Sequence, residues 1–170
     1  MNQLAHGAVV LLLLARCATP GVPLAAPVSV EDRAFVAAVL DIDERSGKLL
    51  SAANFSADHK ELQALGDEMA HRHEKRTRSL REWQKGLDTQ GSSEPLAAPC
   101  ASDPFDRPAS GGDVALLDAL IRHRTCLLQL AQSTQKMTRN PGVRHFADDL
   151  AADAEAELRQ LAVWRRAWGE

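Results

Sequence analysis

The chain repeats itself at a constant offset of 81 residues, and this repeat strongly limits how it can fold. Apolar residues of the first half fall on apolar residues of the second half without a gap. The clearest pairs are Phe35 with Leu116, Val39 with Leu120, Leu49 with Leu130, Leu80 with Leu161 and Trp83 with Trp164. The repeat predicts two units of the same shape. It also predicts that a residue required in both units recurs at the same offset.

Within each unit the apolar residues recur every three or four positions, which is the period of a helix buried along one face. The first helix is expected to begin at Asp32 as its N-cap, and a turn is expected at 54–58. The second helix then runs to about Leu87. A third helix opens at Asp113, and Asn140-Pro141-Gly142 separates it from a fourth.

These helices divide the chain into repeat one at 32–88, a linker at 89–112 and repeat two at 113–168. The linker is rich in Pro, Gly, Ser and Ala and has no periodicity. Two αα-hairpins of equal length bury their apolar faces best on each other. The sequence therefore predicts one all-α domain over 28–170, an antiparallel four-helix bundle of ferritin-like type.

The N-terminal segment is predicted to be a signal peptide over 1–27. Its apolar run from Ala8 to Ala15 is too short to span a bilayer, and no transmembrane segment is expected. The protein is therefore expected to be exported, to the periplasm or outside the cell. A lipid anchor at Cys17 is the alternative, although Arg16 is a poor fit beside a lipidated cysteine.

Export would place Cys100 and Cys126 in an oxidising compartment, where they can form a disulfide. That bond would tie the linker to the third helix. The alternative is two free thiols, with Cys126 packed as a small apolar residue.

Charge and motifs exclude several classes of function. The chain carries 20 Lys and Arg residues against 23 Asp and Glu residues and has no basic stripe, so nucleic acid is not an expected partner. It has neither a Gly-x-Ser-x-Gly elbow nor a phosphate-binding Gly loop, and no enzymatic activity is expected. An unidentified protein or a small ligand is the expected partner.

The order and spacing of many residues carry a family resemblance. They are Phe35, Val36, Val39, Leu49, Leu50, Met69, Leu80 and Trp83 in repeat one, and Leu116, Leu117, Leu120, His123, Leu130, Ala131, Asn140, Pro141, Ala147, Leu150, Glu157, Leu158, Leu161 and Trp164 in repeat two. With these residues the chain resembles the ferritin-like domain-of-unknown-function family 305. The resemblance implies an exported helical bundle, and some members of the family bind copper through His and Met residues.

The chain departs from that family at the metal ligands. The family's His-His positions hold Ile42-Asp43 and His123-Arg124, and its Met positions hold Leu49 and Leu130. Copper binding is therefore not carried over, and no cofactor is expected.

A residual metal site is the alternative. His73 and His123 both fall on core stripes at similar heights, and Cys126 lies one turn from His123. Nitrogen and sulfur ligands of this kind suit copper or zinc. The simpler interpretation is two histidines whose hydrogen bonds are satisfied within the protein.

Glu68 and His71 form a Glu-x-x-His sequence, which di-iron bundles use on two helices. The corresponding residues of repeat two are Asp149 and Ala152, so the second histidine is missing. A surface ion pair is the favoured interpretation.

Four charged residues are related by the same offset with opposite signs: Asp43 corresponds to Arg124, and Arg76 corresponds to Glu157. Our hypothesis is that ion pairs among these four residues replace a metal-binding layer and fix the register of the helices. Four solvated surface charges are the alternative.

Together these observations predict an exported, non-enzymatic binding or interaction module of the cell envelope. The alternative function is copper binding through His123 with His73 and Cys126.

Overall fold

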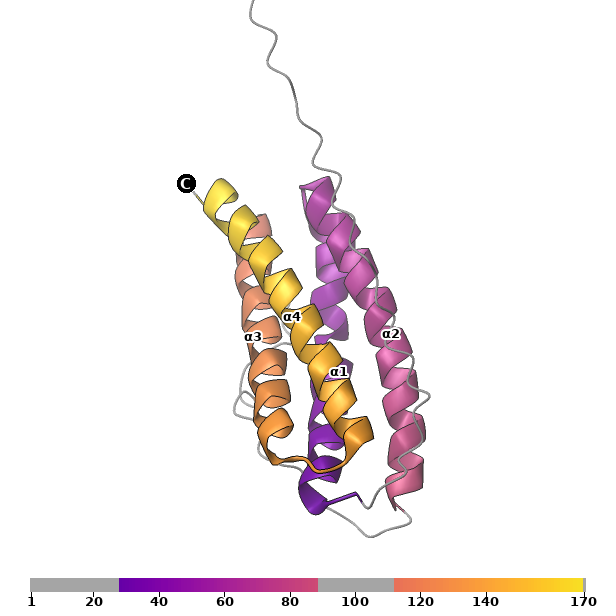
Figure 1. Ribbon diagram of the computed structural model, residues 1–170. Helices are drawn as coiled ribbons and strands as arrows, with labels where there is room; N and C mark the ends of the chain where they lie inside the picture. Colours follow the sequence, from indigo (N-terminus) through magenta and orange to yellow (C-terminus); the bar gives the residue numbers. More distant parts are fainter. Residues whose placement is uncertain (1–27, 89–111, 170) are drawn as a thin grey trace, which may run out of the picture.

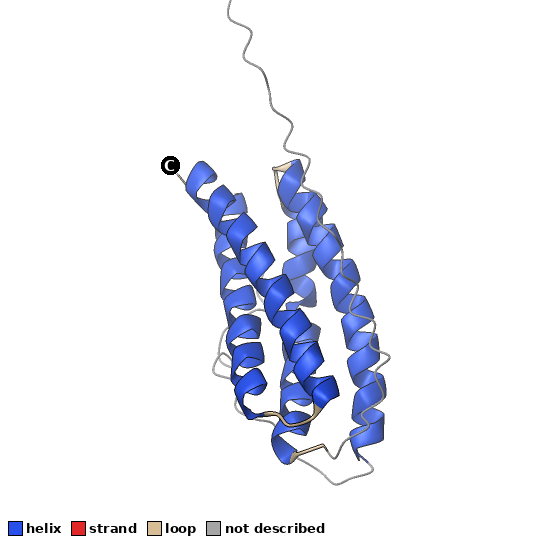
Figure 2. Ribbon diagram, in the orientation of Figure 1, coloured by secondary structure: helices blue, strands red, loops and turns tan. Residues whose placement is uncertain are grey.

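The computed structural model describes residues 28–88 and 112–169, which form four helices and no strand. The helices are α1 (Val30–Ser56), α2 (Lys60–Asp88), α3 (Gly112–Met137) and α4 (Pro141–Trp168). The prediction of an all-α fold is confirmed. The helices lie side by side, with α1 and α2 forming one antiparallel hairpin and α3 and α4 the other (Figures 1 and 2).

The two hairpins match the repeat closely. The ends of α3 and α4 lie within one residue of the positions that the 81-residue offset assigns from α1 and α2. None of the helices in the described part of the chain is long and apolar enough to cross a membrane. The predicted signal peptide, Cys17, Cys100 and residues 89–111 of the linker lie outside the described residues.

The start of α1 differs from the prediction that Asp32 is the N-cap. Ser29 is the N-cap, and its hydroxyl accepts a hydrogen bond from the backbone nitrogen of Asp32 at 3.1 Å. The Asp32 carboxylate in turn accepts from the backbone nitrogen of Ser29 at 3.0 Å. This is a capping box, in which an acidic residue one turn into the helix reaches back to the cap.

The start of α4 follows the sequence prediction. The Asn140 side chain accepts hydrogen bonds from the backbone nitrogens of Gly142 at 2.9 Å and Val143 at 3.1 Å. Pro141 is the first helical residue, where its missing N–H group costs no hydrogen bond.

The third helix was expected to open at Asp113, but Asp113 lies inside α3 and binds the connection before α2. The α3 helix begins at Gly112, which has φ of 73°. The carboxylate of Asp113 accepts hydrogen bonds from the backbone nitrogens of Asp58 at 2.9 Å and His59 at 2.8 Å. The first turn of the second hairpin therefore anchors α2 of the first hairpin.

Aromatic rings close the same end of the bundle. The imidazole of His59 contacts Asp113 at 2.5 Å and stacks on Trp168 with ring centroids 3.8 Å apart. Trp168 in turn stacks on Trp164 at 5.4 Å. Trp168 thus joins α4 to the connection before α2, and the contact of His59 with Asp113 extends this join to α3.

The core consists of two apolar clusters, one toward each end of the bundle. The largest buried residues of the first cluster are Phe35, Ile42, Leu80 and Leu127. Those of the second are Leu49, Leu50, Leu62, Met69, Leu117, Leu120 and Leu161. Along each helix, buried polar residues lie between the two clusters. This polar layer contains the candidate functional residues.

Candidate functional site

The polar layer takes side chains from all four helices. Its buried members are Asp43, Ser46, His73, His123, Arg124 and Glu157, and Arg72 and Arg76 pair with them from α2.

The buried carboxylate of Asp43 has 0 % exposure and binds Arg76 in two places. The Nε and Nη2 atoms of Arg76 each donate to one carboxylate oxygen at 2.6 Å. The Nε2 atom of His73 lies 3.1 Å from Asp43 Oδ1. Burial raises the pKa of Asp43, but Arg76 and His73 outweigh it and hold that pKa far below its usual range.

Ser46 fixes the orientation of the His73 ring. The hydroxyl of Ser46 donates to the backbone oxygen of Asp43 at 3.0 Å, and its oxygen lies 2.8 Å from His73 Nε2. Because the serine hydrogen is already used, His73 Nε2 carries the hydrogen that it donates to Ser46. The other ring nitrogen, Nδ1, then presents a lone pair in the neutral ring.

Ser46, His73 and Asp43 include the residue types of a hydrolase triad, but their geometry is different. A triad places the serine and the carboxylate on opposite nitrogens of the imidazole. Here Ser46 and Asp43 both contact Nε2, and Ser46 is fully buried. Since its hydroxyl is beyond the reach of a substrate, this trio is a structural contact.

Glu157 lies between two arginines. Its Oε2 atom is 2.5 Å from Arg124 Nε, although the two groups are not aligned for a hydrogen bond. Its Oε1 atom accepts from Arg72 Nη2 at 2.5 Å. Arg124 is 2 % exposed, and burial lowers its pKa while Glu157 opposes that shift.

The four charges identified from the repeat are therefore brought into one layer, with direct contacts inside each hairpin. Asp43 pairs with Arg76 between α1 and α2, and Arg124 pairs with Glu157 between α3 and α4. The direct ion pairs join two residues of the same hairpin and not repeat-equivalent residues such as Asp43 and Arg124. In the first hairpin the acid is on the first helix and the arginine on the second, whereas in the second hairpin the arginine comes first and the acid second.

Opposite charges still act between the hairpins at longer range. Burial lowers the pKa of Arg76, and the attraction of Asp43 and, farther away, Glu157 raises it above its usual value. Arg124 is acted on by both members of the first pair: Arg76 disfavours its charged form, and Asp43, with the smaller effect, favours it. The clearest attraction between the hairpins is therefore the one between Arg76 and Glu157.

His123 is fully buried in this layer. Burial, followed by the positive charge of Arg124, holds the pKa of His123 well below its usual range. The ring is therefore neutral at pH 7.

We expect the free energy of unfolding to fall on acidification below about pH 6.5, because the unfolded chain then binds a proton at His123 that the folded chain excludes. The slope approaches about 1.4 kcal/mol per pH unit between the two pKa values. Asp43 adds a further loss below about pH 4, since its pKa is lowered by folding. Urea unfolding from pH 8 to pH 3 measures both. A His123→Gln variant should lack the fall in stability that begins near pH 6.5 and should keep the fall below about pH 4. If the variant has the same pH profile as the native protein, His123 is not the cause of the first fall.

The three residues of the alternative metal site do not form a ligand group. His73 is engaged with Ser46 and Asp43. Cys126 is packed in the first apolar cluster and is disulfide-bonded, so it offers no thiolate. Its predicted partner Cys100 lies outside the described residues. Within 28–88 and 112–169, no group of three or more His, Cys, Asp or Glu residues could hold a metal ion.

Glu68 and His71 do not pair with each other. Glu68 lies 3.3 Å from Arg72, one turn farther along α2, and His71 is exposed. Arg72 was not identified from the sequence because it lies off the apolar stripe. Its position one turn before Arg76 and four residues after Glu68 is the available signal.

Comparisons with known proteins give a structural likeness only. No protein-family model matches the sequence, and no curated protein matches it. Solved structures of CopM match 81 % of the chain: the Cu(I)-bound form at 19 % identity, with a TM-score of 0.67 and 96 % of its own chain covered. The Cu(II)-bound form matches at 20 % identity, with a TM-score of 0.63 and 98 % coverage. A silver-bound form obtained by soaking matches at 19 % identity, with a TM-score of 0.64 and 96 % coverage. The chain therefore shares a fold with proteins whose structures hold copper or silver.

Proposed function

We propose that this protein is an exported, non-enzymatic binding module that has the fold of the CopM bundles and holds its centre together with ion pairs. One observation carries the proposal: both oxygens of the fully buried Asp43 carboxylate are already bound by Arg76. The resemblance to the domain-of-unknown-function family 305 supports the exported bundle, as does the predicted signal peptide.

The central residues do not fit a copper ion. Arg72, Arg76 and Arg124 bring three guanidinium groups to the layer, where they neutralise Asp43 and Glu157. A metal cation there would meet positive charges in a buried, weakly screened environment. It would also have to displace Arg76 from Asp43 or His73 from Ser46 to gain a ligand.

Copper binding is the second candidate, and the CopM structures in copper-bound and silver-bound forms favour it more directly than they favour the first. Among the described residues, the imidazoles of His73 and His123 are the nitrogen ligands nearest the centre, and imidazole suits copper. This candidate requires the polar layer to rearrange when the ion binds.

Calorimetric titration of the purified protein with Cu(I), Cu(II) and Zn(II) separates the two candidates. We expect no stoichiometric binding tighter than about 10 μM, because both oxygens of Asp43 are bound by Arg76 and Glu157 is held between Arg72 and Arg124. The midpoint of thermal unfolding should also be unchanged by added copper, since only a ligand that binds the folded state raises it.

Tight one-to-one binding that is lost in both His73→Gln and His123→Gln variants would establish the copper candidate in place of the first. An exposed-histidine variant, His71→Gln, is the matched control and should leave every titration unchanged.

A further inference from the structure

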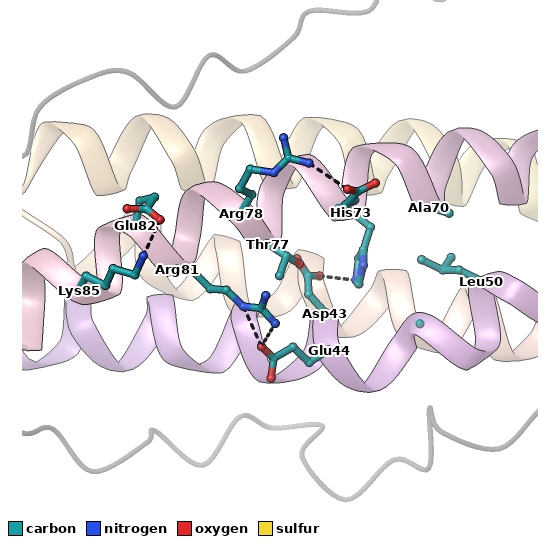
Figure 3. Close-up of a pocket in the computed structure, with 12 residues that line it drawn as sticks. Asp43, Glu44, Leu50, Ala70, His73, Thr77, Arg78, Arg81, Glu82 and Lys85 are labelled. Carbon is teal, nitrogen blue, oxygen red and sulfur yellow. Dashed lines mark hydrogen bonds and ion pairs between the residues drawn. The ribbon is translucent and has the colours of Figure 1, made fainter.

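A groove of about 800 Å³ runs along the first hairpin between α1 and α2 (Figure 3). Its volume lies within the range of small-molecule sites. The residues that line its inner part are Asp43, Gly47, Leu50, Ala70, His73 and Thr77. Charged residues of α1 and α2 line the rest of it.

The internal repeat explains why the groove is open in this hairpin. The 81-residue offset aligns Gly47 with Leu128 and Thr77 with Leu158. Leu128 packs against the first apolar cluster. The second hairpin thus carries two large apolar side chains at the positions where the first hairpin has none.

Gly47 is not required by the backbone. It lies within α1, and a Cβ atom added there meets nothing within 4 Å. A glycine inside a helix makes that helix less stable than alanine would. At Gly47 the stability is given up without a backbone reason, and the groove stays open for an occupant.

The groove is bridged by an ion pair that an occupant can replace. Arg81 of α2 donates to Glu44 of α1 at 2.9 Å, which joins the two helices across the groove (Figure 3). The two side chains are 59 % and 48 % exposed. Exposed pairs of this kind contribute about 0–1 kcal/mol, so exchanging partners is inexpensive.

The remaining charges of the rim indicate the chemistry of the occupant. Arg78 pairs with Glu74 at 2.9 Å, and Lys85 pairs with Glu82 at 2.8 Å. With three acids and three bases, the rim has no net charge, and it offers a partner to each end of a ligand that carries both signs. A carboxylate can take Arg81 while an ammonium group takes Glu44.

The floor completes the recognition. Leu50 and Ala70 line one end of the groove and give it an apolar surface there (Figure 3). His73 also lines the groove, and because its Nε2 atom is engaged by Ser46 and Asp43, Nδ1 is the ring nitrogen that can meet a polar group of the ligand. We propose that the groove binds a short zwitterionic peptide with an apolar side chain. This assignment rests on the proposed binding function and names its ligand class.

The test is calorimetric titration with the free tripeptide alanyl-leucyl-alanine. We expect binding with a Kd of about 0.1 mM, which is typical of a ligand of this size in an open groove. A Gly47→Leu/Thr77→Leu variant, which gives the first hairpin the residues of the second, should weaken binding about tenfold or more. Because leucine already serves at both equivalent positions, this variant is expected to fold.

Gly86→Leu is the matched control, since it adds the same side chain on α2 outside the groove lining and at a glycine with equal room. It should bind the peptide as the native protein does. The tripeptide with acetylated and amidated ends should bind about tenfold more weakly, because it lacks both charges.

Three results would overturn the assignment: no binding of the free tripeptide to the native protein, equal binding to Gly47→Leu/Thr77→Leu, or equal binding of the blocked tripeptide. These peptide titrations are independent of the metal titrations. A groove that does not bind the peptide can therefore be told apart from a protein whose function is to bind copper.

Discussion

Replacing Asp43 by asparagine is expected to lower the free energy of unfolding by about 3 kcal/mol or more, because the substitution leaves the guanidinium of Arg76 buried without its counter-charge. Asparagine keeps the volume of the side chain, so the loss reports charge and not a cavity. Unfolding in urea at pH 7, monitored by circular dichroism, measures the change.

Two variants make this expectation specific to the buried pair. The double variant Asp43→Leu/Arg76→Met removes both charges together, and we expect it to lose much less stability than the single variant does. Glu82→Gln breaks the exposed pair with Lys85 and should change stability by less than about 0.5 kcal/mol. Equal losses from Asp43→Asn and Glu82→Gln would show that the central pair is not energetically coupled.

Reversing one buried pair is expected to be more damaging still. Asp43→Arg/Arg76→Asp preserves an ion pair between α1 and α2, but it puts a carboxylate where Arg76 attracts Glu157 and so turns that buried attraction into repulsion. Like charges placed together in a buried site cost several kcal/mol, on the order of the total stability of a small domain. We expect this variant to unfold at markedly lower urea than the native protein or to remain unfolded.

Reversing both pairs tests whether the hairpins are coupled even if the first variant does not fold. The fourfold variant Asp43→Arg/Arg76→Asp/Arg124→Glu/Glu157→Arg restores the alternation of signs and should recover most of the lost stability. The two pairs act independently if Asp43→Arg/Arg76→Asp is as stable as the native protein. They also act independently if the fourfold variant is no more stable than Asp43→Arg/Arg76→Asp.

The sequence predicted the helices well because each one buries a continuous apolar stripe. The stripes of repeat one and repeat two constrain each other, so the turns near Ala57 and Asn140 were found within a few residues. The start of α1 was misplaced at Asp32 because an acidic residue in a capping box has the same local signature as an N-cap.

The polar layer could be predicted in part. The exchange of charge signs between Asp43 and Arg124 is visible in the sequence, whereas the contacts that result depend on how the helices pack. An offset identifies equivalent positions but gives no distance between helices. The contact of Arg72 with Glu157 joins α2 to α4, and nothing in the local sequence of either helix specifies it.

His59 illustrates a different limit. It lies in the connection before α2, where no helical period relates it to the core. Its actual partners, Asp113 and Trp168, come from the start of α3 and the end of α4. Contacts at the end of a bundle depend on which helix ends meet, which a helical period does not describe.

The contact of Asp113 with the connection before α2 affects the order in which the two hairpins can form their native contacts. During synthesis, α1 and α2 are made first, but the backbone nitrogens before α2 have only water as an acceptor until the first turn of α3 has been made. The first hairpin therefore gains this contact only after the second has begun. The duplicated halves are no longer two independent units, because the earlier half depends on one carboxylate of the later half.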